Sequence, residues 1–427
     1  MRRPLLQLLV TGSAVLTLTG SSLAADLRGY LQESVAVRTA NLDEQIFHRQ
    51  TLHLELTHEP SRSFSLRMAG DIYRDDADFR TSGAEFHSRI REAYVRIRFE
   101  AFDLRVGRMQ LGWGESDALV VSDQVSPFDL SYFIVPEYDE IRLGVDGATL
   151  DYYFDSGTEV QFIWLAHFTS PQFAEMESPW SLLPAEQLGS LTLTAADRPA
   201  GKLRNSEFGL KISGHPVAAD WSVGYLRSWD DRPALLLSTT TATPFHEMFD
   251  LFTAGLAWPI GGVMLRIDNA YEHGRRLGTD PTNEASLPTA TAGYTTRESL
   301  WRSVLAVDLK PDIEWWQQAD LSLQFAHEEV TSPHAGLAGA AETDLVMVRV
   351  SAAYLNDTVK PWVLAVQDVR GHNSWLQAKV DWSPIDHWLF TLEYDGFRGH
   401  AFNGTSGGTY GSLNSNDMIS TTLRYSF

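Results

Sequence analysis

The feature that most constrains the fold of this chain is a two-residue alternation of apolar and polar side chains. Residues 419–427 alternate in this way, with Ile419, Leu423 and Phe427 on the apolar face. Because successive side chains of a β-strand point to opposite faces, each such segment predicts a strand with one apolar and one polar face. Further copies of the pattern lie at 208–212, 263–267, 346–354 and 388–395.

We count about 18 such segments, most of them near the 9–11 residues that a tilted strand needs to cross a bilayer. Short connections, such as 155–157 and 259–261, alternate with long ones, such as 168–203 and 274–297. This pattern predicts an all-β fold, a closed antiparallel transmembrane β-barrel with short periplasmic turns and long outer loops. A barrel of about 16 strands is the main alternative, since bacterial barrels have even strand numbers. A secreted soluble sandwich or β-solenoid is the competing fold.

The N-terminus predicts export from the cytoplasm. Residues 1–24 combine Arg2 and Arg3, an apolar core and small residues at Ser22–Ala24, which is typical of a secretory signal peptide. We therefore predict a signal peptide over 1–24 and one barrel domain over 25–427. Removing the two arginines changes the formal charge from −21 to −23.

Composition excludes several classes of function. The acidic balance argues against nucleic acid as a partner, because phosphates demand a basic face. The chain has no Cys, which excludes a disulfide scaffold and any Cys-ligated metal. We identify no cofactor and no metal site. We also find no motif with catalytic spacing, and we predict no enzymatic activity.

The fourth and fifth strands carry candidate pore residues. Before Gly107 the apolar face holds Val106, but after it the apolar face holds Met109, so we expect a β-bulge near Gly107–Arg108. With that shift, several basic and amide side chains of these two strands should face the barrel interior. They are Arg96, Arg98, Arg105, Arg108 and Gln110.

The connection that follows is both acidic and apolar. Residues 114–143 contain many carboxylates, including Glu115, Asp117, Asp123 and Asp129, with Arg142 as their only cation. A solvated loop would not need the many apolar residues that lie between 119 and 135. We therefore expect residues 114–143 to fold inward, where the acidic loop and the arginine wall would form a constriction with a transverse field. A loop with merely solvated charges is the alternative.

Two resemblances support the barrel. Residues 423–427, which end in Phe427, resemble the C-terminal signal of bacterial outer-membrane proteins, which implies the barrel-assembly machinery as a partner. The stretch from Gly107 to Gly114 resembles a motif of porin-like proteins related to alginate-export barrels, although Met109 departs from it. The inward loop after the fifth strand is similar to that of general diffusion porins.

These observations predict a channel in the outer membrane of a Gram-negative bacterium, for passive diffusion of small polar or charged solutes. The other expected partners are outer-membrane lipid and lipopolysaccharide, and a homo-oligomer is possible. The alternatives are an outer-membrane enzyme of the lipase, protease or deacylase type, and a polysaccharide exporter. The mixed charges expected inside the barrel disfavour an exporter of polyanions.

Overall fold

The computed structural model of the chain describes residues 25–75, 86–114, 119, 121–136, 138–176, 178–182, 189–216, 218–401 and 408–427. Residues 1–24, the predicted signal peptide, lie outside the described residues. Among the described residues, no helix has the length and apolar character needed to cross a bilayer.

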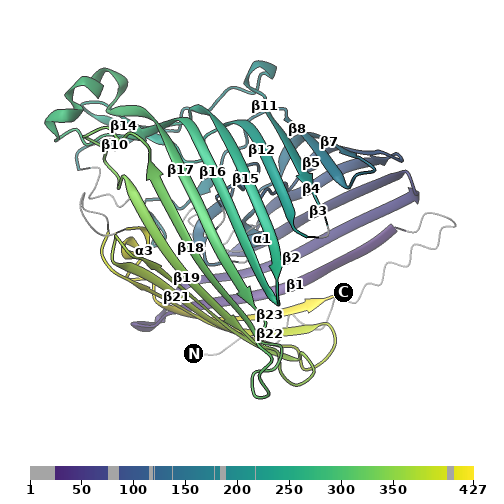
Figure 1. The fold of residues 1–427 in the computed structure, drawn as a ribbon. Helices are drawn as coiled ribbons and strands as arrows, with labels where there is room; N and C mark the ends of the chain where they lie inside the picture. The colour runs from purple at the N-terminus through teal and green to yellow at the C-terminus, as the bar shows by residue number, and fades with distance from the viewer. Residues whose placement is uncertain are drawn as a thin grey trace.

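The fold is a closed antiparallel β-barrel of 18 strands (Figure 1). Each barrel strand pairs with the next one along the chain, and the last strand pairs with the first, with Tyr30 opposite Ser426 and Arg38 opposite Met418. This closure satisfies the edges that an open sheet would leave unpaired in lipid. The prediction of an all-β closed barrel of about 18 strands is therefore confirmed, and the smaller alternative of about 16 strands is not adopted.

The barrel strands are β1 (Ala25–Arg38), β2 (Asn41–Ser61), β3 (Phe64–Asp75), β4 (Phe86–Arg98), β5 (Phe102–Met109), β7 (Val145–Tyr153), β8 (Thr158–Leu165), β11 (Glu207–Gly214), β12 (Asp220–Trp229), β15 (Met248–Ile260), β16 (Val263–Gly278), β17 (Thr295–Leu309), β18 (Asp320–Val330), β19 (Glu342–Ser351), β20 (Val359–Asp368), β21 (Asn373–Trp382), β22 (Trp388–Arg398) and β23 (Met418–Ser426). The alternation in the sequence predicts strand starts close to these bounds except in β2. It predicts a start near Arg49, but the strand begins at Asn41, because residues 41–46 lack the alternation.

Shorter elements lie in the connections. A parallel pair joins β6 (Asp129–Ile134) to β9 (Gln172–Phe173), and a three-stranded sheet joins β10 (Thr192–Leu193), β14 (Thr241–Phe245) and β13 (Ala234–Leu237). The short helices are α1 (Tyr138–Ile141), α3 (Thr409–Ser412), η1 (Leu203–Asn205) and η2 (Glu284–Ala292).

The two ends of the barrel differ in the length of their connections. One end, the short-turn end, holds tight turns such as 62–63 and 261–262, the start of β1 and the end of β23. The other, the long-loop end, holds the connections 110–144, 166–206 and 399–417, although the tight turn 39–40 also lies there. The predicted alternation of short and long connections is confirmed.

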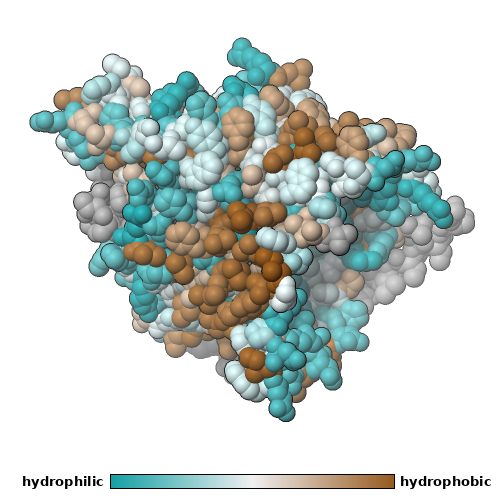
Figure 2. Space-filling model, in the orientation of Figure 1, coloured by the Kyte–Doolittle hydropathy of each residue, from teal (hydrophilic) through white to brown (hydrophobic). Residues whose placement is uncertain are grey.

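The outward face of the wall is apolar. Figure 2 shows apolar side chains gathered on the middle of this face, between more polar ends. A row of rings crosses neighbouring strands, in which Tyr225, Phe252 and Tyr271 lie opposite one another in register. Trp258 and Trp301 are also exposed on this face. Such aromatic rows are typical of the two girdles at the bilayer interfaces.

From the sequence, the position of Trp362 near a strand end predicts that it belongs to such a girdle, but it lies inside the barrel. Its ring lies 4.9 Å from the Lys379 ammonium and packs against an apolar cluster inside the barrel. The alternation of β20 explains this position, since the next residue, Val363, is the exposed one. The prediction that Trp362 belongs to a girdle is therefore wrong.

Two apolar clusters occupy part of the barrel interior. The first gathers around Met109, Leu111 and Trp113 on the β5 side. The second gathers around Phe133, Trp375 and Phe397 and includes Trp180 from the 166–206 connection and Tyr410 from α3. Packed side chains from three long connections thus fill interior space toward the long-loop end.

Candidate functional site

Two of the arginines that the sequence places in the pore, Arg96 and Arg105, bind residues of neighbouring strands in the barrel wall. Arg96 of β4 forms an ion pair with Asp103 of β5. Arg105 Nη2 lies 3.2 Å from Asp151 Oδ2 of β7, and its Nε donates to Thr149 Oγ1 at 3.0 Å. These contacts neutralise both guanidinium groups within the wall.

Arg98 and Arg108 lie at opposite ends of the same pair of strands. Arg98, at the short-turn end, is 3.5 Å from Glu59 in an exposed pair. Arg108 makes two hydrogen bonds of 2.8 and 2.6 Å with Asp146. Strand alternation places Arg108 on the face of the exposed Val106, which is the outward face and not the predicted inward one.

The predicted bulge at Gly107–Arg108 is wrong. β5 pairs with both β4 and β7 in unbroken register through these residues. The apolar side chains change face because the interior itself becomes apolar there. Met109 and Leu111 continue the inward face and pack into the first interior cluster.

The register shift lies one strand earlier, in β4. Ala69 of β3 pairs with Glu92, but Gly70 pairs with Ile90, so Arg91 is the extra residue of a bulge. A bulge re-aims the side chains beyond it, and here it brings Arg91 inward beside Glu92. The polar pattern of the sequence changes phase at this point, which is the signal that could have located both Arg89 and Arg91.

The 110–144 connection, which we call the β5–β7 connection, is held together by Asp123 and Arg142. The two form a buried ion pair, and Asp123 also accepts hydrogen bonds of 2.9 Å from Trp113 N and from Tyr138 Oη. Gln110 donates to the carbonyl of Arg142. Burial alone would lower the pKa of Arg142, but the hydrogen bond and charge of Asp123 raise it. Burial, with Asp123, also raises the pKa of Tyr138.

Asp129 and Glu140 link the β5–β7 connection to the wall. Arg89 Nη1 lies 3.2 Å from Asp129 Oδ2, and Arg89 Nη2 donates to the Glu140 carbonyl at 2.9 Å. On the last strand, Arg424 Nη2 lies 2.7 Å from Glu140 Oε1. The carboxylates of the connection therefore meet arginines on β4 and β23 that were not among the predicted pore residues.

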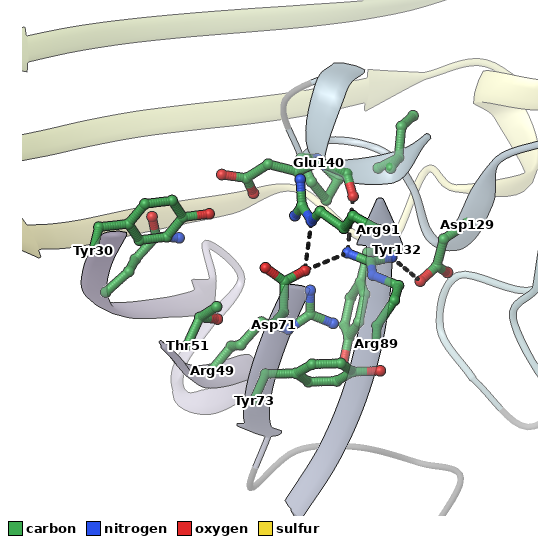
Figure 3. Close-up of a pocket in the computed structure, with 13 residues that line it drawn as sticks. Tyr30, Arg49, Thr51, Asp71, Tyr73, Arg89, Arg91, Asp129, Tyr132 and Glu140 are labelled. Carbon is green, nitrogen blue, oxygen red and sulfur yellow. Dashed lines mark hydrogen bonds and ion pairs between the residues drawn. The ribbon is translucent and has the colours of Figure 1, made fainter. Parts of the chain in front are cut away.

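Asp71 of β3 organises the arginines on β4. Arg91 Nε donates to its carboxylate at 2.6 Å, and Arg89 Nη2 donates at 3.2 Å. His53 Nδ1 lies 2.8 Å from the second oxygen of Asp71. Figure 3 shows Arg89 and Arg91 converging on Asp71, with Arg89 reaching on to Asp129.

The β5–β7 connection also contacts the opposite side of the barrel. The backbone amide of Ser122 donates to Asp268 of β16 at 3.3 Å, and Gln124 donates to Glu272 of the same strand at 2.7 Å. The Leu119 amide donates to Gln324 of β18 at 3.2 Å. The connection is thus bound at one side to β4 and β23 and at the other to β16 and β18.

Two cavities that share lining residues lie beside these contacts. The larger, about 310 Å³, is bounded by β1, β2, β21, β22, β23 and the β5–β7 connection. The smaller, about 30 Å³, is the one drawn in Figure 3. Arg49, Gln32, Tyr132, Pro136 and Glu140 line both. The sequence offered no signal for Arg49 beyond its place in a polar alternation.

Glu115 and Asp117 lie outside the described residues, so the structure brings together Gln110, Asp123 and Asp129 but not the whole predicted set. Among the described residues, no group of three His, Asp or Glu side chains is placed to hold a metal ion.

Comparisons with known proteins match both the sequence and the fold. A family model described as "Protein of unknown function (DUF1302)" matches residues 40–427. No curated protein matches the sequence.

Solved structures with a similar fold include proteins of Acinetobacter baumannii and Pseudomonas aeruginosa. OccAB3 of Acinetobacter baumannii is 7% identical with a TM-score of 0.54, over 95% of this chain and 99% of that one. The outer membrane protein OpdK of Pseudomonas aeruginosa is 8% identical with a TM-score of 0.53, over 94% and 98%. A structure of OpdK with vanillate is 9% identical with a TM-score of 0.55, over 95% and 98%. At these identities the likeness concerns the fold.

Proposed function

The chain belongs to the family described as "Protein of unknown function (DUF1302)", whose model matches residues 40–427. From this premise we propose that it is an outer-membrane channel through which small polar or charged solutes diffuse passively. The observation that carries the proposal is the β5–β7 connection, whose charged and polar groups are bound to the inner faces of β4, β16 and β23 in a closed 18-stranded barrel.

The outer membrane is the location that the surface supports best. The band of apolar side chains on the outward face would lie in hydrocarbon, and the polar ends would lie in the headgroup regions (Figure 2). Closed barrels are the one β architecture that satisfies every backbone group in lipid. The likeness to the outer membrane protein OpdK agrees with this location.

The β5–β7 connection would narrow the passage. Its two sides are bound by charged groups of the wall, Arg89 and Arg424 on one side and Asp268 on the other. A rim that carries both signs of charge favours solutes that can exchange water for hydrogen bonds, and it disfavours apolar ones. We therefore expect selection among small solutes by size and charge.

The groups that produce the transverse field would differ from the arginine wall that the sequence predicts. Arg96 and Arg105 are paired within the wall, whereas Arg89 and Arg424 pair with carboxylates of the connection. Arg91 donates to the Asp139 carbonyl of the connection at 3.2 Å. We propose that these three arginines, together with Asp129 and Glu140, form the constriction.

An enzyme or a polysaccharide exporter fits less well. The buried carboxylates of the interior, such as Asp71 and Glu272, are bound to arginines. A polyanion would need a continuous basic path, but the interior arginines Arg89, Arg91 and Arg424 each lie beside a carboxylate. Passive diffusion of small solutes requires neither.

Planar-bilayer recording tests the proposal. Purified folded protein should insert and give stepwise conductance in potassium chloride, with a reversal potential under a salt gradient that shifts when Arg89 and Arg424 are both changed to Gln. Protein that is folded and inserted but conducts no ions would refute the channel.

A further inference from the structure

Arg49 of β2 is held in place by aromatic rings rather than by acceptors. Its guanidinium carbon lies 4.6 Å from the centre of the Tyr132 ring and 5.0 Å from the centre of the Tyr73 ring. Its one ionic contact is between Nε and Asp75, at 3.6 Å. Tyr132 Oη, at 2.6 Å, and the His48 amide, at 3.1 Å, already donate to that carboxylate.

The guanidinium therefore has open donors. An arginine offers five N–H groups, and among the described residues none of those of Arg49 reaches an acceptor within hydrogen-bond distance. The side chain is 23% exposed, and it lines both interior cavities. Polar groups in such partly buried positions normally have partners, so these donors await water or a ligand.

The other basic groups of the larger cavity are occupied. Arg424 lies 2.7 Å from Glu140 and donates to Gln32 at 2.6 Å. Lys379 lies 3.9 Å from Asp381 and over the Trp362 ring. Arg49 is thus the cation of this cavity whose hydrogen-bonding capacity is left for a solute.

The lining of the cavity indicates what that solute carries. A planar fork of donors matches a carboxylate, which it can bind through two parallel hydrogen bonds. The same cavity is lined by the apolar groups Phe47, Val135 and Leu389 and by the hydroxyl residues Ser34 and Thr422. A volume of about 310 Å³ suits one small organic molecule.

The acids of the cavity limit the charge of the solute. Glu140, Asp381 and Glu393 lie around the same space. One carboxylate can pair with Arg49, but a second would face these acids without a free cation, which is costly in a confined site. We propose that Arg49 binds the carboxylate of a small organic monoanion with an apolar body, in a site that disfavours dianions and cations. The proposal rests on the proposed function, since it names the class of solute.

Ligand-observed NMR on the folded protein in detergent tests this site without requiring conduction. The probes are benzoate, the neutral isostere benzamide, the dianion terephthalate and the cation benzylammonium. Benzoate should bind at least about tenfold more tightly than the other three, because it alone gains a charge-assisted hydrogen-bond pair without an unpaired charge.

Substitutions at Arg49 locate the effect. Arg49→Gln should lower benzoate affinity about tenfold, to the level of benzamide, and Arg49→Lys should retain part of it because the charge remains but the fork is lost. Arg370→Gln, which removes a charge from an exposed pair at the long-loop end, is the matched control and should bind benzoate as the wild type does.

Equal binding of benzoate and benzamide by the wild type, or benzoate binding unchanged in folded Arg49→Lys and Arg49→Gln, would overturn the site. If Arg49→Gln fails to fold, the comparison of the four probes on the wild type decides alone. Selective benzoate binding by a protein that conducts no ions would refute the channel but keep the site. Conductance without benzoate selectivity would refute the Arg49 site but keep the channel.

Discussion

Asp123 and Arg142 form a buried ion pair inside the β5–β7 connection, with side chains that are 3% and 11% exposed. Arg142 also donates to the Leu111 carbonyl at 2.8 Å and lies 5.0 Å from the centre of the Tyr138 ring. The pair therefore fixes both ends of the connection to each other, independently of the barrel wall.

Loss of this pair should free the connection without opening the barrel. Arg142→Gln leaves the Asp123 carboxylate buried and unpaired, which costs about 3 kcal/mol. The variant should still migrate as a folded barrel in unheated gels, but proteases should cut within 119–136. Arg370→Gln serves as the control for loss of an arginine. Equal protease resistance in the two variants would contradict this role.

Trp113 anchors the start of the connection on two glycines of the wall. A Cβ at Gly209 would lie 2.9 Å from the Trp113 ring, and one at Gly224 would lie 3.1 Å from it. The indole Nε1 donates to Gln161 at 2.8 Å. Gly209→Val should displace the ring and increase current noise in single-channel records, because the connection loses its anchor.

A control substitution in the 166–206 connection separates this effect from the mere addition of a valine side chain. Gly201→Val adds the same side chain where a Cβ meets open space, so its current noise should equal that of the wild type. Quiet wild-type currents in Gly209→Val would refute the anchoring role of Trp113.

The arginines that contact the connection should control ion selectivity more than those paired within the wall. Changing Arg89 and Arg424 to Gln removes the cations opposite Asp129 and Glu140, so the channel should become more cation-selective. The single charge removed by Arg96→Gln should matter less than the single charge removed by Arg89→Gln or Arg424→Gln, because both Arg96 and its partner Asp103 belong to the wall and not to the connection. Reversal potentials of Arg89→Gln, Arg424→Gln and Arg96→Gln in a salt gradient check this ranking. A larger shift for Arg96→Gln would reverse the assignment.

Closure of the barrel depends on Gly29. Its amide and carbonyl pair with Phe427 at 3.0 and 2.9 Å, and a Cβ would lie 2.3 Å from the His53 carbonyl and 2.9 Å from the Phe427 ring. Gly29→Ala should therefore lower the yield of heat-resistant folded barrel, whereas Gly201→Ala should not. Equal yields would show that the C-terminal strand closes without this contact.

The same contact bears on the assembly machinery expected from the C-terminal resemblance. We propose that the strand ending in Phe427 is read by that machinery before it pairs with Gly29. Deletion of Phe427 should slow insertion into outer-membrane vesicles that contain the machinery more than it slows insertion into pure lipid. Equal slowing in both would indicate a purely structural role.

The sequence predicted the barrel well because its signal is periodic and long-range. Strand alternation and the order of short and long connections depend on many residues, so single exceptions such as Asn41 or Trp362 do not disturb the result. The 18 strands and the closure between Tyr30 and Ser426 follow from that pattern.

The candidate site was less accessible to prediction for a physical reason. Whether Arg89 or Arg91 faces the β5–β7 connection depends on one extra residue in β4, and a shift of one residue reverses every side chain beyond it. The partner of Glu140 is Arg424, on the last strand, and no local pattern connects residues so distant in sequence. Arg49 stands out only once its lack of acceptors is visible.

The most direct test of this account compares single-channel conductance of the wild type with that of a variant in which residues 121–134 are replaced by a short Gly-Ser linker. If the β5–β7 connection narrows a passage through the barrel, the wild type should conduct in discrete steps and the variant should conduct severalfold more. Equal conductance of the two folded proteins, or a silent wild type, would contradict the account.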